Sequence, residues 1–133
     1  MEAEIPGCEP ANAALLQLIE SLEQENSDLT TDYLAGDFLA RRDPTVHWLQ
    51  ACVNKTVFDY FDHLDMGYPI NWSLQGWPNV NRTGDYHDPH NHPHAYLSGT
   101  YYVSVPDGDL QSAAARTYVP AASVSTIRVA RPT

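Results

Sequence analysis

The sequence predicts an α+β fold in which helices come first and strands follow. Up to about residue 65, apolar residues recur at the three- and four-residue spacing that is typical of helices. After Pro69 the apolar period falls toward two, which is typical of strands. A length of 133 residues with 43% hydrophobic content suits a single domain over residues 1–133. We therefore expect helices that pack outside a sheet or barrel.

The first expected helix spans residues 12–25 of a helical N-terminal region that covers residues 1–70. Asn12 is a favoured capping residue. The helix carries an apolar stripe formed by Leu15, Leu18, Ile19 and Leu22, with its glutamates facing water. The polar stretch that follows is expected to be mostly loop, with a short element around Tyr33–Leu39.

The second expected helix begins at Asp43-Pro44, where Asp is the cap and proline suits the first helical position. It runs to about Asp65, before Gly67 and Pro69. One apolar stripe follows it, formed by Val46, Leu49, Val53, Val57, Phe61 and Leu64, with Phe58 beside it.

The strands are expected in residues 71–110, followed by an atypical tail over residues 111–133. The aromatic residues between Trp72 and Val80 predict an extended conformation for this stretch. In a strand over 95–105, one face suits a core (Leu97, Gly99, Tyr101, Val103 and Val105). The other face is polar and suits the lining of a site (Tyr96, Ser98, Thr100, Tyr102 and Ser104). One more strand is expected from Val124 to Ala130.

Histidines gather between the two expected strand regions. The segment from His87 to His94 holds four of the six histidines of the chain. Imidazoles are the commonest metal ligands in proteins. His90 and His92 are two positions apart, so an extended chain presents both on one side. The sequence therefore predicts a metal bound by His90 and His92, whereas His87 and His94 are read as supporting or surface groups.

The sequence around the histidines resembles that of a known protein family. The chain reads Gly76-Trp77-Pro78-Asn79-Val80-Asn81, then Gly84-Asp85-Tyr86-His87, then His90-Asn91-His92-Pro93, and then Ser98-Gly99-Thr100-Tyr101-Tyr102-Val103. These stretches resemble, in order, the Trp-x-Asn, Gly-Asp-Tyr-His, His-x-His-Pro and Ser-Gly-x-Tyr-Tyr-Val steps of the 2-oxoglutarate- and Fe(II)-dependent oxygenases. This family lies within the wider double-stranded β-helix, or cupin-like, group.

The resemblance implies a double-stranded β-helix, or jelly roll, whose strand end presents the first metal ligands. By position His90 looks like the first histidine of the family, and His92 stands where the acidic ligand is usual. The implied cofactors are Fe(II) and 2-oxoglutarate. Asn79, Ser98 and Tyr102 are the residues that we expect to line the cofactor pocket. The sequence identifies no catalytic residue.

The chain departs from the family after Leu110. No histidine follows His94, so the distal ligand of the family has no counterpart, and we expect a chain that lacks the C-terminal part of the jelly roll. A non-haem Fe(II) site usually holds two His and one carboxylate. His87, Asp88 and Asp85 remain open as the third ligand. A cationic partner for 2-oxoglutarate is left open among Arg116, Arg128 and Arg131.

Three functions are therefore weighed. The leading one is a hydroxylase-type oxygenase that uses Fe(II) and 2-oxoglutarate. This enzyme would be inactive if it lacks the distal His of the family and the Arg that binds 2-oxoglutarate there. The second is a non-enzymatic metal-binding jelly-roll fragment. The third is a cupin-type metalloprotein that works without 2-oxoglutarate. The substrate, a small molecule or a peptide, is not indicated by the sequence.

Composition restricts the partners and the compartment. A net charge of −10 with only seven Lys and Arg argues against nucleic acid and anionic membranes. Without a long apolar run or a secretory leader, the chain is expected to be cytoplasmic, with Cys8 and Cys52 as reduced thiols. Unpaired strand edges of an incomplete roll favour a homodimer as a hypothesis.

Overall fold

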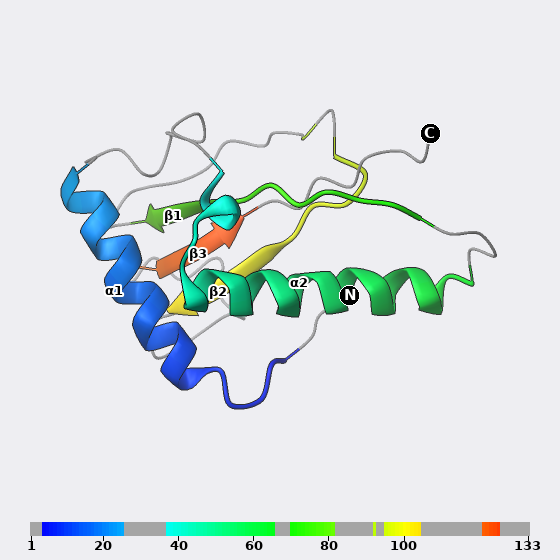
Figure 1. Cartoon of the computed structure of the whole chain (residues 1–133), viewed down its shortest axis with the longest axis horizontal. Helices are drawn as coiled ribbons and strands as arrows, with labels where there is room; N and C mark the ends of the chain where they lie inside the picture. The colour runs from blue at the N-terminus through cyan, green and yellow to red at the C-terminus, as the bar shows by residue number, and fades with distance from the viewer. Residues whose placement is uncertain are drawn as a thin grey trace, which may run out of the picture.

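The protein has an α+β fold, seen in a computed structural model that describes residues 4–25, 37–65, 70–81, 92, 95–104 and 121–125. The element order is α1 (Glu9–Glu25), the 3-10 helix η1 (Phe38–Ala40), α2 (Pro44–His63), β1 (Trp77–Asn81), β2 (Thr100–Ser104) and β3 (Ala121–Ser125). Figure 1 shows α1 lying across the sheet, whereas α2 meets the sheet near its N-terminal end and extends beyond it. None of the helices in these ranges is long and apolar enough to span a membrane.

Helix α1 begins three residues earlier than the apolar stripe predicted. The backbone N–H of Asn12 already donates to the Cys8 carbonyl at 2.8 Å, so Asn12 lies within the first helical turns. The prediction of Asn12 as the cap was therefore wrong, because its amide bonds other side chains instead. The predicted stripe is confirmed at Leu15 and Ile19, which are fully buried.

Helix α2 begins where its capping residue predicted. The Asp43 carboxylate accepts hydrogen bonds from the N–H groups of Thr45 (2.8 Å) and Val46 (3.2 Å), and Pro44 is the first helical residue. The helix ends at His63, two residues before the predicted end at Asp65. Four stripe residues are buried, namely Val46, Leu49, Val57 and Phe61. Leu64 is 42% exposed, because it lies beyond the last helical turn and the stripe ends before it.

The three strands form one antiparallel sheet with β3 between β1 and β2. Both predicted early strands are shorter than expected. Residues 95–99 belong to no strand, and Trp72 precedes β1 without joining the sheet. The last strand begins at Ala121 rather than Val124, and residues 126–133 lie outside the described ranges. The pairing of β2 with β3 shifts between Tyr102 and Ser104, which is a β-bulge at Val103.

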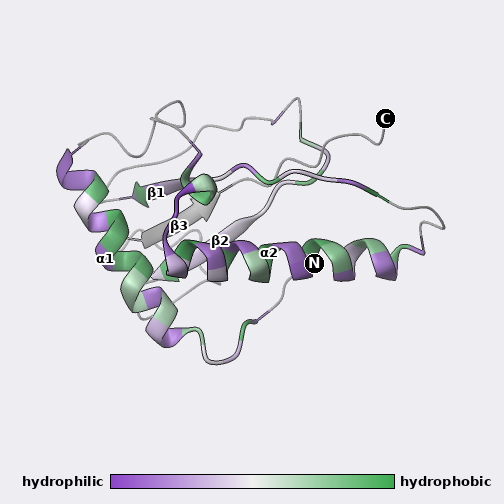
Figure 2. Cartoon of the chain, in the orientation of Figure 1, coloured by the Kyte–Doolittle hydropathy of each residue, from purple (hydrophilic) through white to green (hydrophobic). Residues whose placement is uncertain are grey.

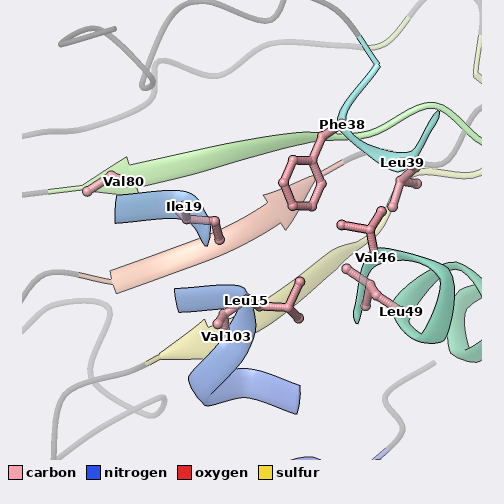
Figure 3. Packing of buried hydrophobic residues seen from close by; sticks show 8 residues of the cluster. All are labelled: Leu15, Ile19, Phe38, Leu39, Val46, Leu49, Val80 and Val103. Atoms are coloured by element: carbon pink, nitrogen blue, oxygen red, sulfur yellow. The ribbon is translucent and has the colours of Figure 1, made fainter. Parts of the chain in front are cut away.

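One hydrophobic core joins both helices to one face of the sheet. Figure 3 shows side chains from α1, η1, α2, β1 and β2 converging: Leu15, Ile19, Phe38, Leu39, Val46, Leu49, Val80 and Val103. Each is at most 6% exposed. Figure 2 shows apolar and polar residues alternating along α1 and α2, as in amphipathic helices. Burial of this face therefore fixes which side of the sheet the helices cover.

A smaller cluster extends the core along the C-terminal half of α2. Val57 and Phe61 are its buried members. The Phe61 ring lies 5.9 Å from the Trp72 ring and 6.0 Å from the Tyr96 ring, between centroids. Trp72 Nε1 donates to the Asn54 side-chain oxygen at 2.8 Å. These contacts hold the segments that lead into β1 and β2 against the helix.

Candidate functional site

The two faces of the sheet have different partners. On β1, Val80 belongs to the core under the helices, and on β2 Tyr101 and Val103 do the same. Side chains alternate along a strand, so Trp77 and Asn79 of β1 lie on the opposite face. Thr100 and Tyr102 lie on that same face of β2, and both are exposed, whereas Tyr101 is half-buried and Val103 is buried. The predicted division of this strand into a core face and a polar face is thus confirmed within β2.

Asn79 and Tyr102 share one row across this second face. Both have Ser123 of β3 as their Cα partner, which places them two strands apart, roughly 10 Å between backbones. Asn79 is only 6% exposed, whereas Tyr102 is 51% exposed. Trp77 and Thr100 form the next row, because both pair with Ser125. The polar face therefore combines a buried amide with an exposed phenol. We refer to Trp77, Asn79, Thr100 and Tyr102 as the polar sheet face.

His92 lies beside this face. Its imidazole is 5.9 Å from the Trp77 ring, between centroids, at an interplanar angle of 49°. Its carbonyl accepts a hydrogen bond from the Ala95 N–H at 2.9 Å. The side chain is half-buried. One of the predicted metal ligands is therefore placed next to the strand that carries Asn79.

The other predicted site residues are placed less fully. His90 lies outside the described ranges, as do His87, His94, Asp85, Asp88 and the three arginines considered for 2-oxoglutarate. Ser98 is exposed in the segment before β2. The two histidines of α2, His47 and His63, are both exposed. Within the described residues, no group of three or more His, Cys, Asp or Glu side chains could hold a metal ion.

Trp77 is the residue of this region whose position the sequence did not predict. It is half-buried on the polar sheet face and contacts His92. Its place two residues before Asn79 carries the signal, since strand alternation puts the two on one face. The indole provides a flat apolar surface that limits where the imidazole can lie.

Comparison with known proteins bears on this same region. Residues 75–131 match a family model described as "Putative 2OG-Fe(II) oxygenase". The matched segment contains β1, β2, β3 and the histidine segment, and it runs past Leu110, where the motif resemblance ends. Helices α1 and α2 lie outside it. No curated protein and no solved structure shows significant similarity to the chain.

Proposed function

We propose that this protein is an Fe(II)- and 2-oxoglutarate-dependent oxygenase of the hydroxylase type. The observation that carries the proposal is the family match over residues 75–131, because that segment includes His92 and the polar sheet face. Two imidazoles at positions 90 and 92 are donors that suit Fe(II). The bound iron and 2-oxoglutarate would supply O2 activation coupled to decarboxylation of 2-oxoglutarate to succinate.

The chain's own residues take different parts in this proposal. His90 and His92 hold the metal, with the third ligand open among His87, Asp88 and Asp85. Trp77 positions the His92 ring, since the two rings lie 5.9 Å apart. For the cosubstrate, Asn79, Ser98 and Tyr102 provide amide and hydroxyl groups that can donate hydrogen bonds to a carboxylate or keto oxygen.

We also propose a jelly-roll architecture around this face. In the strand order β1-β3-β2, β1 pairs with β3 rather than with β2, the strand described next in the chain. Jelly rolls and other Greek-key sheets have such connections, whereas simple meanders do not. The helix-covered face and the polar sheet face would then be the outer and inner sides of one half of the roll. Unpaired edges of the roll would support the homodimer, which light scattering in solution can test.

The test is an anaerobic titration of Fe(II) and then 2-oxoglutarate into the purified protein. We expect the visible charge-transfer band of an Fe(II)–2-oxoglutarate chelate. His92→Ala and His92→Phe should both abolish the band or weaken iron binding at least tenfold, as loss of a metal ligand does. His92→Phe keeps a ring against Trp77, so it separates metal ligation from packing. His47→Ala changes an exposed histidine on α2 and should leave the band unchanged.

A metal-binding protein that works without 2-oxoglutarate is the second candidate. The absence of any histidine after His94 favours it, because the distal ligand of the oxygenases has no counterpart in the sequence. In this case iron or another divalent metal still binds and His92→Ala still weakens it, but 2-oxoglutarate adds no band. This outcome would select the cupin-type or non-enzymatic function over the oxygenase. Metal affinity that is equal in the wild type and in the His90→Ala/His92→Ala double variant would refute both.

A further inference from the structure

The helix-covered face of the sheet contains a cluster of polar groups that the proposed function does not use. Asn12 of α1 bridges two other residues at the helix start. Its Nδ2 lies 3.6 Å from Cys8 Sγ, and its Oδ1 accepts a hydrogen bond from the Tyr101 hydroxyl at 2.6 Å. Tyr101 comes from β2, so a single amide joins the N-terminal segment to the sheet. Cys8 is thereby held beside the Tyr101 hydroxyl.

The second thiol approaches the same tyrosine from α2. The Trp48 ring packs edge-on against the Tyr101 ring, with 6.4 Å between centroids and an interplanar angle of 73°. Cys52 lies four residues after Trp48, and residues at this spacing share one face of a helix. Cys8 and Cys52 are both free and half-buried. The same tyrosine therefore has both thiols near it, although they are 44 positions apart in sequence.

Electrostatic coupling supports this closeness. Burial raises the pKa of the Cys52 thiol, and the neighbouring Cys8 raises it further. Burial also raises the pKa of Tyr101, Cys8 and Cys52 raise it further, and the hydrogen bond with Asn12 lowers it. Each of the two thiols thus interacts with the other and with the same phenol. Their juxtaposition depends on the packing of α1, α2 and β2 and not on local sequence.

We propose that Cys8 and Cys52 form a peroxide-reactive dithiol site that closes to an intramolecular disulfide. One thiol attacks a hydroperoxide, becomes a sulfenic acid and releases water or an alcohol. The second thiol then displaces the hydroxyl group of the sulfenic acid as water, and the S–S bond forms. The two thiols lose two electrons and two protons in total, and the peroxide O–O bond accepts them. Thiol reductants such as dithiothreitol reverse the reaction.

The environment assigns an order to the two thiols. Asn12 Nδ2 donates to Cys8 Sγ at 3.6 Å, so the Cys8 sulfur has a polar partner at the cluster. Burial raises the pKa of the Cys52 thiol and so lowers its thiolate fraction, and a thiol reacts with peroxide as the thiolate. Cys8 is therefore assigned the first oxidation, and Cys52 is the thiol that resolves it. In Cys52→Ser the sulfenic acid of Cys8 has no partner and should be trapped by dimedone. Cys8→Ser should react at least tenfold more slowly with peroxide.

The test is intact-mass spectrometry of the native protein after a stoichiometric dose of hydrogen peroxide. We expect a monomer that is about 2 Da lighter, which has lost both free thiols and recovers them with dithiothreitol. Peptide mapping should identify the Cys8–Cys52 link. Trp48 fluorescence should fall as the disulfide forms, which gives a readout independent of any activity.

Two controls keep the result decisive if a variant is unstable. The wild type unfolded in guanidinium has the same thiols without the cluster, and its intramolecular disulfide should form at least tenfold more slowly than in the native protein. Tyr101→Phe keeps the ring but removes the hydroxyl that holds Asn12, and it should slow closure several-fold. Equal rates in the native and unfolded protein would overturn the proposal. So would sulfinic acid or intermolecular disulfides as the only products.

Discussion

Asp37 links η1 to the beginning of β1, and its removal should be among the costliest substitutions outside the core. One carboxylate oxygen of Asp37 accepts hydrogen bonds from the Leu39 N–H at 3.1 Å and from the Gly76 N–H at 3.0 Å. The Phe38 N–H donates in return to the Gly76 carbonyl at 2.8 Å. This double connection fixes residue 76, immediately before Trp77, so it sets where β1 begins.

The expected loss follows from the two donors that Asp37→Ala would leave without an acceptor. Gly76 is buried, and an unsatisfied buried N–H costs about 1–3 kcal/mol. Loss of the bond to Leu39 resembles loss of a helix cap, which costs about 1 kcal/mol. We therefore expect Asp37→Ala to lower the free energy of unfolding by about 3 kcal/mol. Asp37→Asn keeps an acceptor oxygen and should lose only about 1 kcal/mol.

Urea denaturation followed by tryptophan fluorescence measures both variants. We expect the urea midpoint to be highest for the wild type, lower for Asp37→Asn and lowest for Asp37→Ala. The dependence of the unfolding free energy on urea concentration should be equal in all three. If Asp37→Ala lost less than about 0.5 kcal/mol, the connection would be a surface contact and the reasoning would be wrong. A further readout is the His92 environment, since Trp77 follows Gly76 directly and its ring contact with His92 should loosen.

Other substitutions test the core and the tyrosine cluster. Leu49→Ala truncates a fully buried side chain and should cost about 3–4 kcal/mol in urea denaturation, whereas the exposed His47→Ala on the same helix should cost under about 0.5 kcal/mol. Tyr101→Phe removes the 2.6 Å hydrogen bond to Asn12 and should cost about 1 kcal/mol, a loss that a double-mutant cycle with Asn12→Ala should assign to this pair. Burial raises the pKa of Cys52, so the unfolded chain releases this proton at lower pH than the folded chain. The contribution of Cys52 to the free energy of unfolding is therefore complete below the ordinary thiol pKa of about 8.5 and is lost as the pH rises further. Cys52→Ser should make the free energy of unfolding less dependent on pH between about pH 8 and 10.

Local chemistry predicted the start of α2 but not the start of α1. Asp43-Pro44 places the start of α2 correctly, because a capping carboxylate and a proline act within the first turn. The start of α1 was predicted too late, because Asn12 is a good cap in isolation. Its amide instead bonds Cys8 and Tyr101, the latter 89 positions away, and such a distant partner leaves no mark in the local sequence.

Alternation along a strand was predictable, whereas the partners of the strand were not. The division of β2 into a core face and a polar face follows from residue types alone. The insertion of β3 between β1 and β2 does not, since register depends on which distant strands bury their apolar sides together. This insertion makes Asn79 and Tyr102 partners of the same residue, Ser123. The motifs therefore predicted Asn79 and Tyr102 as site residues, whereas only the pairing of the sheet shows that they lie in one row.

Strand β2 contributes neighbouring tyrosines to the two proposed sites, the dithiol site and the cosubstrate site. Tyr101 points to the helices and binds Asn12, and Tyr102 is 51% exposed on the polar sheet face. Because adjacent side chains leave a strand on opposite sides, the dithiol site and the proposed cosubstrate site share a backbone but not a surface. A change at one tyrosine can reach the other only by moving β2, and the bulge at Val103 is the place where the β2–β3 pairing is already irregular. Disulfide closure that left the pairing intact would therefore leave the polar sheet face as it is, whereas closure that shifted β2 would change the distance from Tyr102 to Asn79.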